Sequence, residues 1–583
     1  LVCFFIIVTI ANSDFIDGRY QLHYDERLLF DQVKNIFHHD SKTQLISLIL
    51  DSNDHRYGRI YYNINALFGY LPKEIYGFKG MIFSGRLTSS LFLFSSFIIL
   101  ILTFLQNWII RICTLVILFN VPYCWYYMTM PKPEPMQLFF LSLFFYFFKN
   151  DNFFLKPKNY WIFAGMALGA KISTVPILLV IFATGLYCSL IINGYRKISD
   201  SFPKIILYTS LGLTISVPIL LPYFIASTFI YIIITRSSWY KGWNKSYKTI
   251  ALLVTVILSN FFISFFFKNV FGIQTGLSKW MQWTIFGTKH GADNSSINIF
   301  KWINYLFYDW IICPNGLSAL LIFNCILIVS VILVNKKKIN SPHLKNVIYS
   351  SALLIISGLF SIFLIFFNVK RIWGFYLFPS FTLIIVGMAI LAEILISKKF
   401  SITSKTKILF FKLISLSFFL IFGWIVVFYW HSNNALIYKD FANRSNNKKY
   451  EVDNVSYLNT IDFLKNLSFS IGGKISVYYD DEVLFVPDPN EYFHVNSCWG
   501  PFQFWEHKAH ALVFSEYRIK RLKGSHDPNE KNYPKLIAES RGYEKYVVDK
   551  DQECSTEFCY RREKILENGS EILVLETPNL LKP

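Results

Sequence analysis

The sequence predicts a polytopic α-helical membrane protein of about 13 transmembrane helices with a small C-terminal α/β domain. Of its 583 residues, 53% are hydrophobic and only 16% are charged, against roughly 25% charged in soluble domains. Apolar runs of roughly 17 to 25 residues, the length that crosses a bilayer, recur through the first three quarters of the chain. From about Asn433 the chain is polar and has no such run. These features predict a membrane domain over 1–431 and a soluble domain over 432–583.

The chain opens on LVCFFIIVTIAN, which is either a truncated first transmembrane helix or the core of a signal peptide. We favour the helix, because no small-residue cleavage site is clear. A polar, amphipathic stretch over 13–80 follows and is rich in His, Tyr, Asp and Arg. It is too long for a simple connection, and loops of this kind usually carry function.

Further spans are predicted at 82–105, 112–129, 135–148, 159–172, 174–193, 205–222, 223–235, 249–267, 311–334, 347–367, 373–396 and 408–431. Residues 205–235 could instead form one long helix bent at Pro218 and Pro222. The charge pattern favours a hairpin, because five clusters of Lys and Arg then fall on one side. That side is the cytoplasm by the positive-inside rule.

The opposite, extracytoplasmic side then receives every unusual polar segment. These segments are the 13–80 loop, the PKPEP turn, the 268–309 loop, the NVKR turn and the C-terminal domain. In that last domain, a helical pattern, YLNTIDFLKNL, alternates with strand-like runs, KISVYY, EVLFV, ALVFS, KYVV and EILVLE. No glycine-rich loop follows any of these runs, so a nucleotide site is not indicated.

Charge and cysteine content limit the partners. The formal net charge is +19, but Lys and Arg lie mainly in short loops between apolar runs, so nucleic acid is not an expected partner. Cys498, Cys554 and Cys559 share the C-terminal domain, where CSTEFC can form a disulfide in an oxidising compartment. Three thiols with no His at metal spacing make a zinc site improbable.

The first outer loop contains DGRYQLHYDERLLFDQ, in which Asp25 and Glu26 adjoin His23, Tyr24 and Arg27. Neighbours on a helix diverge by about 100°, so the two acids would face different partners. One would face a reacting hydroxyl and the other a positioning group or an ion. The alternative is a solvated helix start whose acids are favoured by the helix dipole.

Basic residues lie where spans meet the outer surface, and a lipid phosphate headgroup would match their charge. Each could instead snorkel to the interface. The set comprises Lys79, Arg86, Lys132, Lys171, Lys370 and Arg371. The turn MPKPEP adds Glu134 beside Lys132, and the loop SKWMQWTIFGTKHGADNSS offers His290 among aromatic residues. An interfacial aromatic belt is the plainer interpretation of Trp280 and Trp283.

With these features the chain resembles the GT-C class of membrane glycosyltransferases, nearest to protein O-mannosyltransferases and the aminoarabinose transferases acting on lipid A. The resemblance rests on HYDERLLF, HRYGRIYYNINALFGYLP, GRLTSSLF, MPKPEPMQLFF, GMALGAKIST and KRIWGFYLFPSF, which together cover most of the membrane domain. The WWDYG motif of oligosaccharyltransferases is absent. Many relatives carry a Pro after the glycine of HRYGR, which leaves the roles of Arg56 and Arg59 open.

The resemblance implies transfer of a sugar from a polyprenyl phosphate donor to a hydroxyl of a lipid, glycan or protein acceptor, with inversion. Asp25 would be the general base and Glu26 its helper. Lys370, Arg371 and Arg86 would bind the donor phosphate. His23, Tyr57, Lys132, Glu134 and His290 would contact substrates.

No cofactor or metal is indicated, although a divalent ion is compatible with the site. We expect an integral protein of a bacterial inner membrane with its C-terminal domain outside the cytoplasm. A transporter or flippase of lipid-linked glycans is the alternative, disfavoured because no internal repeat is visible.

Overall fold

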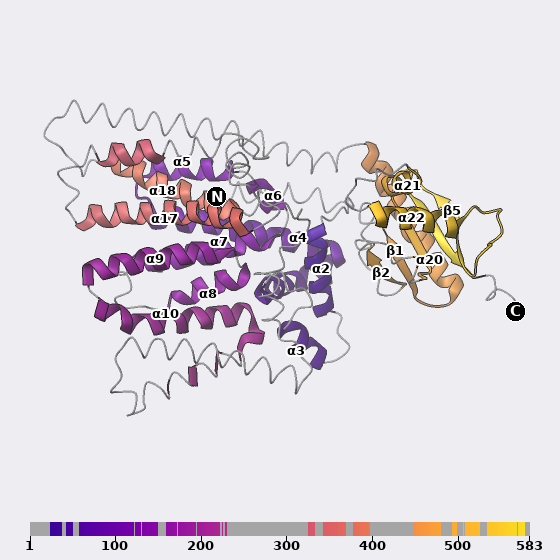
Figure 1. The fold of residues 1–583 in the computed structure, drawn as a ribbon, viewed down its shortest axis with the longest axis horizontal. Coiled ribbons are helices and arrows are strands. Elements are labelled where there is room, and N and C mark those ends of the chain that lie inside the picture. Colours follow the sequence, from indigo (N-terminus) through magenta and orange to yellow (C-terminus); the bar gives the residue numbers. More distant parts are fainter. Residues whose placement is uncertain are drawn as a thin grey trace. The chain divides into compact units, whose positions relative to one another are not determined.

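The structure is a computed structural model. Apart from five isolated positions (224–225, 228–229, 232) and Trp505, it describes residues 24–37, 42–50, 58–121, 123–129, 131–149, 159–171, 173–193, 195–221, 324–332, 342–368, 377–396, 448–479, 492–497, 508–524, 533–567 and 569–577. These residues divide into two compact units (Figure 1). The first holds 28–74 and 84–396, and the second holds 448–577 together with 24–27 and 75–83.

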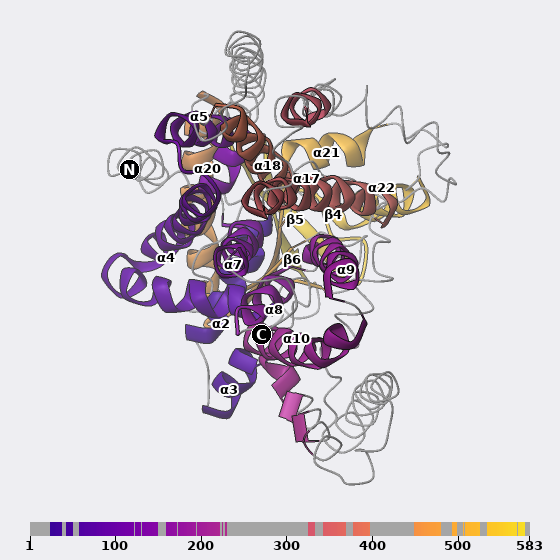
Figure 2. The ribbon, with the colours of Figure 1, turned by 90° about the vertical axis from the view of Figure 1, so that its left-hand side faces the viewer.

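The first unit is helical. Its described helices are α2 (Tyr24–Phe37, shared with the second unit), α3 (Lys42–Leu50), α4 (Arg59–Phe104, of which 75–83 belong to the second unit), α5 (Trp108–Phe119), α6 (Cys124–Thr129), α7 (Pro133–Phe148), α8 (Trp161–Ala170), α9 (Thr174–Asn193), α10 (Tyr195–Ser216), α17 (Pro342–Asn368) and α18 (Phe378–Ile396), with the short helix η1 (Pro218–Leu220) after α10 and a helical stretch over 324–332. Figure 2, in which many of these helices are seen nearly end-on, shows α8 beside both α7 and α10.

Three helical stretches of the described residues are long and apolar enough to cross a membrane: Gly80–Phe104, Asn346–Leu364 and Phe378–Ile396. They coincide with the spans predicted at 82–105, 347–367 and 373–396. Helix α18 is buried around nearly its whole circumference, as expected of a helix surrounded by other helices. The spans predicted at 1–12, 223–235, 249–267 and 408–431 fall almost entirely outside the described residues.

The span predicted at 112–129 is wrong, because the structure breaks it into α5 and α6. Asn120 ends α5, and its side-chain amide donates to the Val116 carbonyl at 2.8 Å. Pro122 follows, and Tyr123 has a positive φ of 70°. Proline lacks the N–H that would continue the ladder. The cap at Asn120 and the proline that follows it therefore end the helix, although the apolar residues of 112–129 predicted a continuous one.

Glycines allow α8 and α10 to pack with their backbones in contact. A Cβ placed on Gly165 would collide with the Thr209 carbonyl, and one on Gly212 would collide with the Ile162 carbonyl. Close approach at small residues is a principal source of helix association in membranes. Helix α10 ends at Ser216, two residues before Pro218.

Helix α4 is bent sharply at Gly77, whose φ of 64° and ψ of −152° are not helical. The two halves fold toward one another, because the Ser84 hydroxyl donates to the Phe68 carbonyl at 2.8 Å although 16 residues separate them. In a straight helix such residues would be about 24 Å apart. The first half of α4 therefore folds back to reach Ser84, within the span Gly80–Phe104.

The described residues of the C-terminal part of the second unit contain a six-stranded sheet of order β2-β1-β3-β6-β5-β4. Strands β1, β2 and β5 of this sheet are labelled in Figure 1. Its elements are α20 (Lys448–Ile471), β1 (Ile475–Tyr479), β2 (Phe493–Ser497), β3 (Ala511–Phe514), α21 (Glu516–Lys523), α22 (Tyr533–Tyr546), β4 (Val547–Val548), β5 (Cys559–Ile565) and β6 (Glu571–Glu576). Strand β1 is parallel to β2 and β3, whereas β6 is antiparallel to β3 and β5.

Side chains alternate across this sheet, so helices cover both faces. Ala511 and Val513 share one buried cluster with Leu464 of α20. Leu512 and Phe514 share another, which includes residues of α21 and α22. The segments KISVYY, ALVFS, KYVV and EILVLE contain β1, β3, β4 and β6, while EVLFV lies outside the described residues. Strands β2 and β5 were not predicted.

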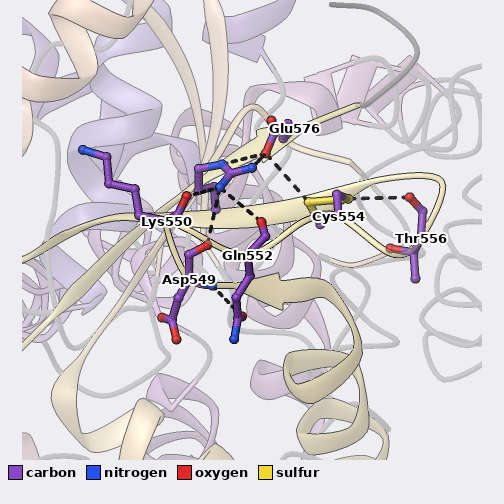
Figure 3. A network of polar contacts seen from close by, with 8 residues as sticks. Asp549, Lys550, Gln552, Cys554, Thr556 and Glu576 are labelled. Carbon is purple, nitrogen blue, oxygen red and sulfur yellow. Dashed lines mark hydrogen bonds and ion pairs between the residues drawn. A yellow bond between two sulfur atoms is a disulfide. The ribbon is translucent and has the colours of Figure 1, made fainter.

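Cys554 and Cys559 form a disulfide next to β5, which confirms the predicted CSTEFC bond. The Arg561 guanidinium binds the turn that precedes this disulfide. Figure 3 labels Asp549, Lys550 and Gln552 of that turn beside Cys554 and Glu576. The Arg561 Nε donates to the Glu576 carboxylate at 2.7 Å, and its Nη1 donates to the carbonyls of Asp549, Lys550 and Gln552. One guanidinium thus ties a turn to two strands.

Candidate functional site

A buried ion pair joins the start of α7 to the end of α8. The Lys171 ammonium contacts the Glu134 carboxylate, and their side chains are only 7% and 1% exposed. Pro133 is the first residue of α7 and places Glu134 in the first helical turn. The positive end of the helix dipole favours a carboxylate there. Among the described residues, the second oxygen of Glu134 accepts no hydrogen bond.

Polar side chains extend this pair along α7. The Ser173 hydroxyl donates to the Gln137 side-chain oxygen at 3.3 Å. The Thr174 hydroxyl donates to the Lys171 carbonyl at 2.7 Å and fixes the turn between α8 and α9. Gln137 is fully buried. Burying a polar group costs free energy unless the group forms hydrogen bonds. Polar side chains at this end of the apolar helices α7 and α8 therefore indicate a functional site.

Two glycines bring Arg59 to the same end of the helices. A Cβ on Gly58 would collide with the Gly169 carbonyl, so the residue before Arg59 touches the backbone two residues before Lys171. Arg59 is 2% exposed, and its guanidinium donates to the Gln32 side chain of α2 at 3.5 Å. Helix α2 is therefore bound to the start of α4.

Arg86 and Lys132, each 2% exposed, lie where α4 passes the end of α6. The hydroxyls of Ser89 and Ser90 donate to the Tyr127 and Met128 carbonyls at 2.9 and 2.6 Å. Helix α2 also packs here, because a Cβ on Gly85 would lie 3.0 Å from the Phe30 ring.

We call Arg59, Arg86, Lys132, Glu134 and Lys171 the buried charged set. Four members are cations and one is a carboxylate. Ionisable side chains buried between apolar helices are rare and mark functional sites by default. Such a set is suited to bind an anionic group, and arginine can do so through two parallel hydrogen bonds.

The other end of the same helices carries a different arrangement. The Glu393 carboxylate accepts hydrogen bonds from the backbone N–H groups of Gln106 and Asn107, at 2.8 Å from each. The Lys149 ammonium, at the end of α7, contacts the Thr103 carbonyl. These bonds satisfy backbone groups at helix ends and indicate a structural role.

The other predicted site residues are placed less completely. Asp25 and Glu26 lie in the first turn of α2, but their side chains are outside the described set. His23, Tyr57, His290, Lys370 and Arg371 also fall outside it. Within the described ranges, no group of three or more His, Cys, Asp or Glu side chains is arranged to hold a metal ion.

No protein-family model matches the chain, and no curated protein matches its sequence. Among solved structures, the chain is similar to ArnT from Cupriavidus metallidurans in the apo state. The sequences are 11% identical, the alignment covers 100% of this chain and 99% of that one, and the TM-score is 0.35. A likeness of this degree does not establish a shared fold.

The sequence singled out Arg86, Lys132, Glu134 and Lys171 but gave Arg59 no role and overlooked Gln137. The position of Arg59 could have been inferred from two glycines in the sequence. Gly58, directly before Arg59, and Gly169, two residues before Lys171, are small enough for the close backbone approach that the structure shows. Gln137 had none. It is a single amide in the apolar run PMQLFF.

Proposed function

We propose that the chain is an integral membrane glycosyltransferase of the GT-C type. It takes a sugar from a polyprenyl phosphate donor and transfers it to an acceptor hydroxyl at the extracytoplasmic face. The observation that carries this proposal is the buried charged set at one end of an apolar helical unit. It provides cations for a lipid phosphate at the depth where a headgroup meets the hydrocarbon.

In the reaction, the acceptor oxygen attacks the anomeric carbon from the face opposite the phosphate, which inverts that centre. The bond from carbon to phosphate oxygen breaks, and polyprenyl phosphate leaves. The attacking hydroxyl has a pKa far above neutrality, so a carboxylate must take its proton. We assign that proton to Asp25, with Glu26 as its helper.

We propose that Arg86, together with Lys370 and Arg371, binds the phosphate of the donor. Preorganised cations stabilise the charge that develops on a departing phosphate oxygen. Glu134 fits a substrate-positioning role, because Lys171 holds one of its oxygens while the other accepts no hydrogen bond among the described residues. That oxygen is suited to accept a hydrogen bond from a sugar or acceptor hydroxyl.

We place the protein in a bacterial inner membrane with the C-terminal domain outside the cytoplasm. The disulfide between Cys554 and Cys559 supports this side, because disulfides persist in oxidising compartments.

The test is transfer by purified protein supplied with polyprenyl phosphate sugars and candidate acceptors. We expect Asp25→Asn to reduce turnover roughly 10²- to 10⁴-fold, the usual contribution of a general base. The matched control is Glu74→Gln, which removes an acid whose side chain is 54% exposed. Full activity in Asp25→Asn would refute the role of Asp25. Movement of lipid-linked sugar across vesicles without transfer would identify a flippase instead.

A further inference from the structure

Gln137 carries a buried polar group that the proposed mechanism does not use. It lies in α7 between apolar residues, and its side chain is fully buried. The Ser173 hydroxyl donates to its side-chain oxygen at 3.3 Å. Its amide nitrogen, in contrast, donates no hydrogen bond among the described residues. Because burying an amide without a partner costs free energy, the free N–H of Gln137 indicates that a ligand meets it there.

Glu134 presents the complementary atom on the same face of α7. Residues three positions apart on a helix are neighbours, and Glu134 precedes Gln137 by three. The short turn between α8 and α9 contacts both of them, through Lys171 to Glu134 and through Ser173 to Gln137. Each contact uses one polar atom and leaves another, and the second oxygen of Glu134 accepts no hydrogen bond within the part of the chain that the structure describes. A buried acceptor and a buried donor therefore lie side by side.

Hydrogen bonds fix the backbone of this turn. The Lys171 N–H donates to the Ala167 carbonyl at 3.1 Å, and the Thr174 N–H donates to the Lys171 carbonyl at 3.1 Å. The Thr174 hydroxyl donates to the same two carbonyls, at 2.9 and 2.7 Å. The two side chains that the turn extends to α7 therefore have a fixed origin, and the free donor and acceptor are oriented before a ligand binds. Such preorganisation lowers the free-energy cost of binding.

We propose that Gln137 and Glu134 together bind one hydroxyl group of the sugar that is transferred. The hydroxyl donates to the free oxygen of Glu134 and accepts from the N–H of Gln137. A hydroxyl can do both, because it carries one O–H donor and two acceptor lone pairs. This inference rests on the proposed function. It assigns the hydroxyl to the donor sugar, because two cations of the buried charged set, which is suited to the donor phosphate, adjoin Glu134: Lys132 directly precedes α7, and Lys171 contacts the carboxylate.

The same pair discriminates against a sugar that carries an amino group at this position. A protonated amine has N–H donors and no acceptor, so the N–H of Gln137 would face a positive charge and stay unpaired. Lys171 already neutralises Glu134, so the ammonium would gain little from the carboxylate. A sugar without any polar group at this position would leave the buried donor and acceptor both unbonded, which sites of this kind reject. The pair therefore selects a neutral, hydroxylated sugar.

The test compares donors with and without the hydroxyl, using the full chain purified in lipid nanodiscs. The donors are polyprenyl phosphate mannose and glucose, their monodeoxy derivatives and the matching amino derivatives. The variant is Gln137→Met, which keeps the length of the side chain and removes its N–H groups. The matched control is Gln106→Met, because Gln106 is exposed and lies two residues after α4. Transfer gives kcat/KM, tryptophan fluorescence gives the Kd of each donor, and thermal unfolding verifies the fold.

We expect the parent to use one monodeoxy donor and its amino counterpart about 10-fold less efficiently than the hydroxylated sugar, the effect of one lost hydrogen bond. Gln137→Met should lower kcat/KM for the hydroxylated sugar by about 10-fold and abolish this preference, whereas Gln106→Met should keep it. An equal loss with every donor would indicate a structural role and overturn the inference, while sugar transfer by the parent would still stand.

Binding separates the inference from the proposed function. If the parent transfers none of these donors, the proposed function fails, and the Kd values decide the inference. A preference for the hydroxylated sugar in Kd that Gln137→Met abolishes would support it, and a preference that the variant keeps would overturn it. Donors that neither bind nor transfer would overturn both.

Discussion

At the scale of single residues, Glu134 and Lys171 form a buried ion pair within the described part of the helical unit. Both side chains are buried, and 37 residues separate them in the chain. Removing charges from water is costly, and their mutual attraction only partly offsets that cost. Such a pair is therefore better explained by what it positions than by net stabilisation.

A double-mutant cycle tests this pair. We expect Glu134→Leu and Lys171→Met each to lower the stability of the detergent-solubilised protein by about 3–5 kcal/mol, because each leaves the charge of its partner buried and unpaired. The double variant Glu134→Leu/Lys171→Met should recover much of that loss and still be inactive. Thermal unfolding and the transfer assay measure the two effects. A loss of stability in the double variant equal to the sum of the two single-variant losses would show that the pair is not coupled.

Arg561 gives a second residue-scale prediction. We expect Arg561→Met to lower the concentration of dithiothreitol at which Cys554 and Cys559 can be alkylated. The turn over Asp549–Gln552 loses its donor, so the reduced loop opens more readily. The control is Glu557→Gln, whose exposed side chain lies between the two cysteines. The same reduction midpoint in both variants would contradict the prediction.

At the scale of elements, the apolar runs of the sequence predicted where most of the described helices lie, whereas capping residues and prolines determine where those helices begin and end. The predicted span 174–193 coincides with α9, and 135–148 with α7 apart from its proline start. The break at Asn120 was missed, because a window of apolar residues hides one capping amide. Strand β5, CYRREKI, was missed because its charges suggest a surface loop. In the folded sheet, Arg561 pairs with Glu576 and Arg562 pairs with Asp549.

The candidate site, like the helices, was predicted only in part from the sequence. The sequence marked most of its charged residues, because ionisable groups beside apolar runs stand out. It did not indicate which residues meet, since Glu134 and Lys171 come together only through the packing of α7 on α8.

The glycine contact between α8 and α10 can be tested directly. We expect Gly165→Ala to destabilise the protein by about 1–3 kcal/mol, because the added methyl group forces two backbones apart. Gly473→Ala is the matched control, since a Cβ there meets nothing within 4 Å. Thermal unfolding in detergent measures both. An unchanged transition in Gly165→Ala would mean that the helices can separate without cost.

At the scale of the whole molecule, the helical unit has two unlike ends. One carries the buried charged set, and the other carries the bonds of Glu393 and Lys149 to backbone groups. In the orientation that we propose from the positive-inside rule, the second end faces the cytoplasm.

Single-cysteine labelling tests this orientation. In a chain whose nine native cysteines are replaced by serine, we expect Glu74→Cys to react with an impermeant maleimide in right-side-out vesicles. Gln106→Cys should react only in inverted vesicles, because it lies at the end of the span Gly80–Phe104. The reverse pattern would invert the topology and move the proposed chemistry to the cytoplasm.

The order of strands in the C-terminal sheet determines when that sheet can be completed during synthesis. Strand β6 comes last of the six along the chain, yet it lies in the interior of the sheet between β3 and β5. The parallel strands β1 to β3 therefore cannot join β5 and β4 until the ribosome has released residues up to Glu576. A chain cut short before Glu571 would lose the middle of its sheet and not an edge, and would leave two unpaired strand edges open to aggregation.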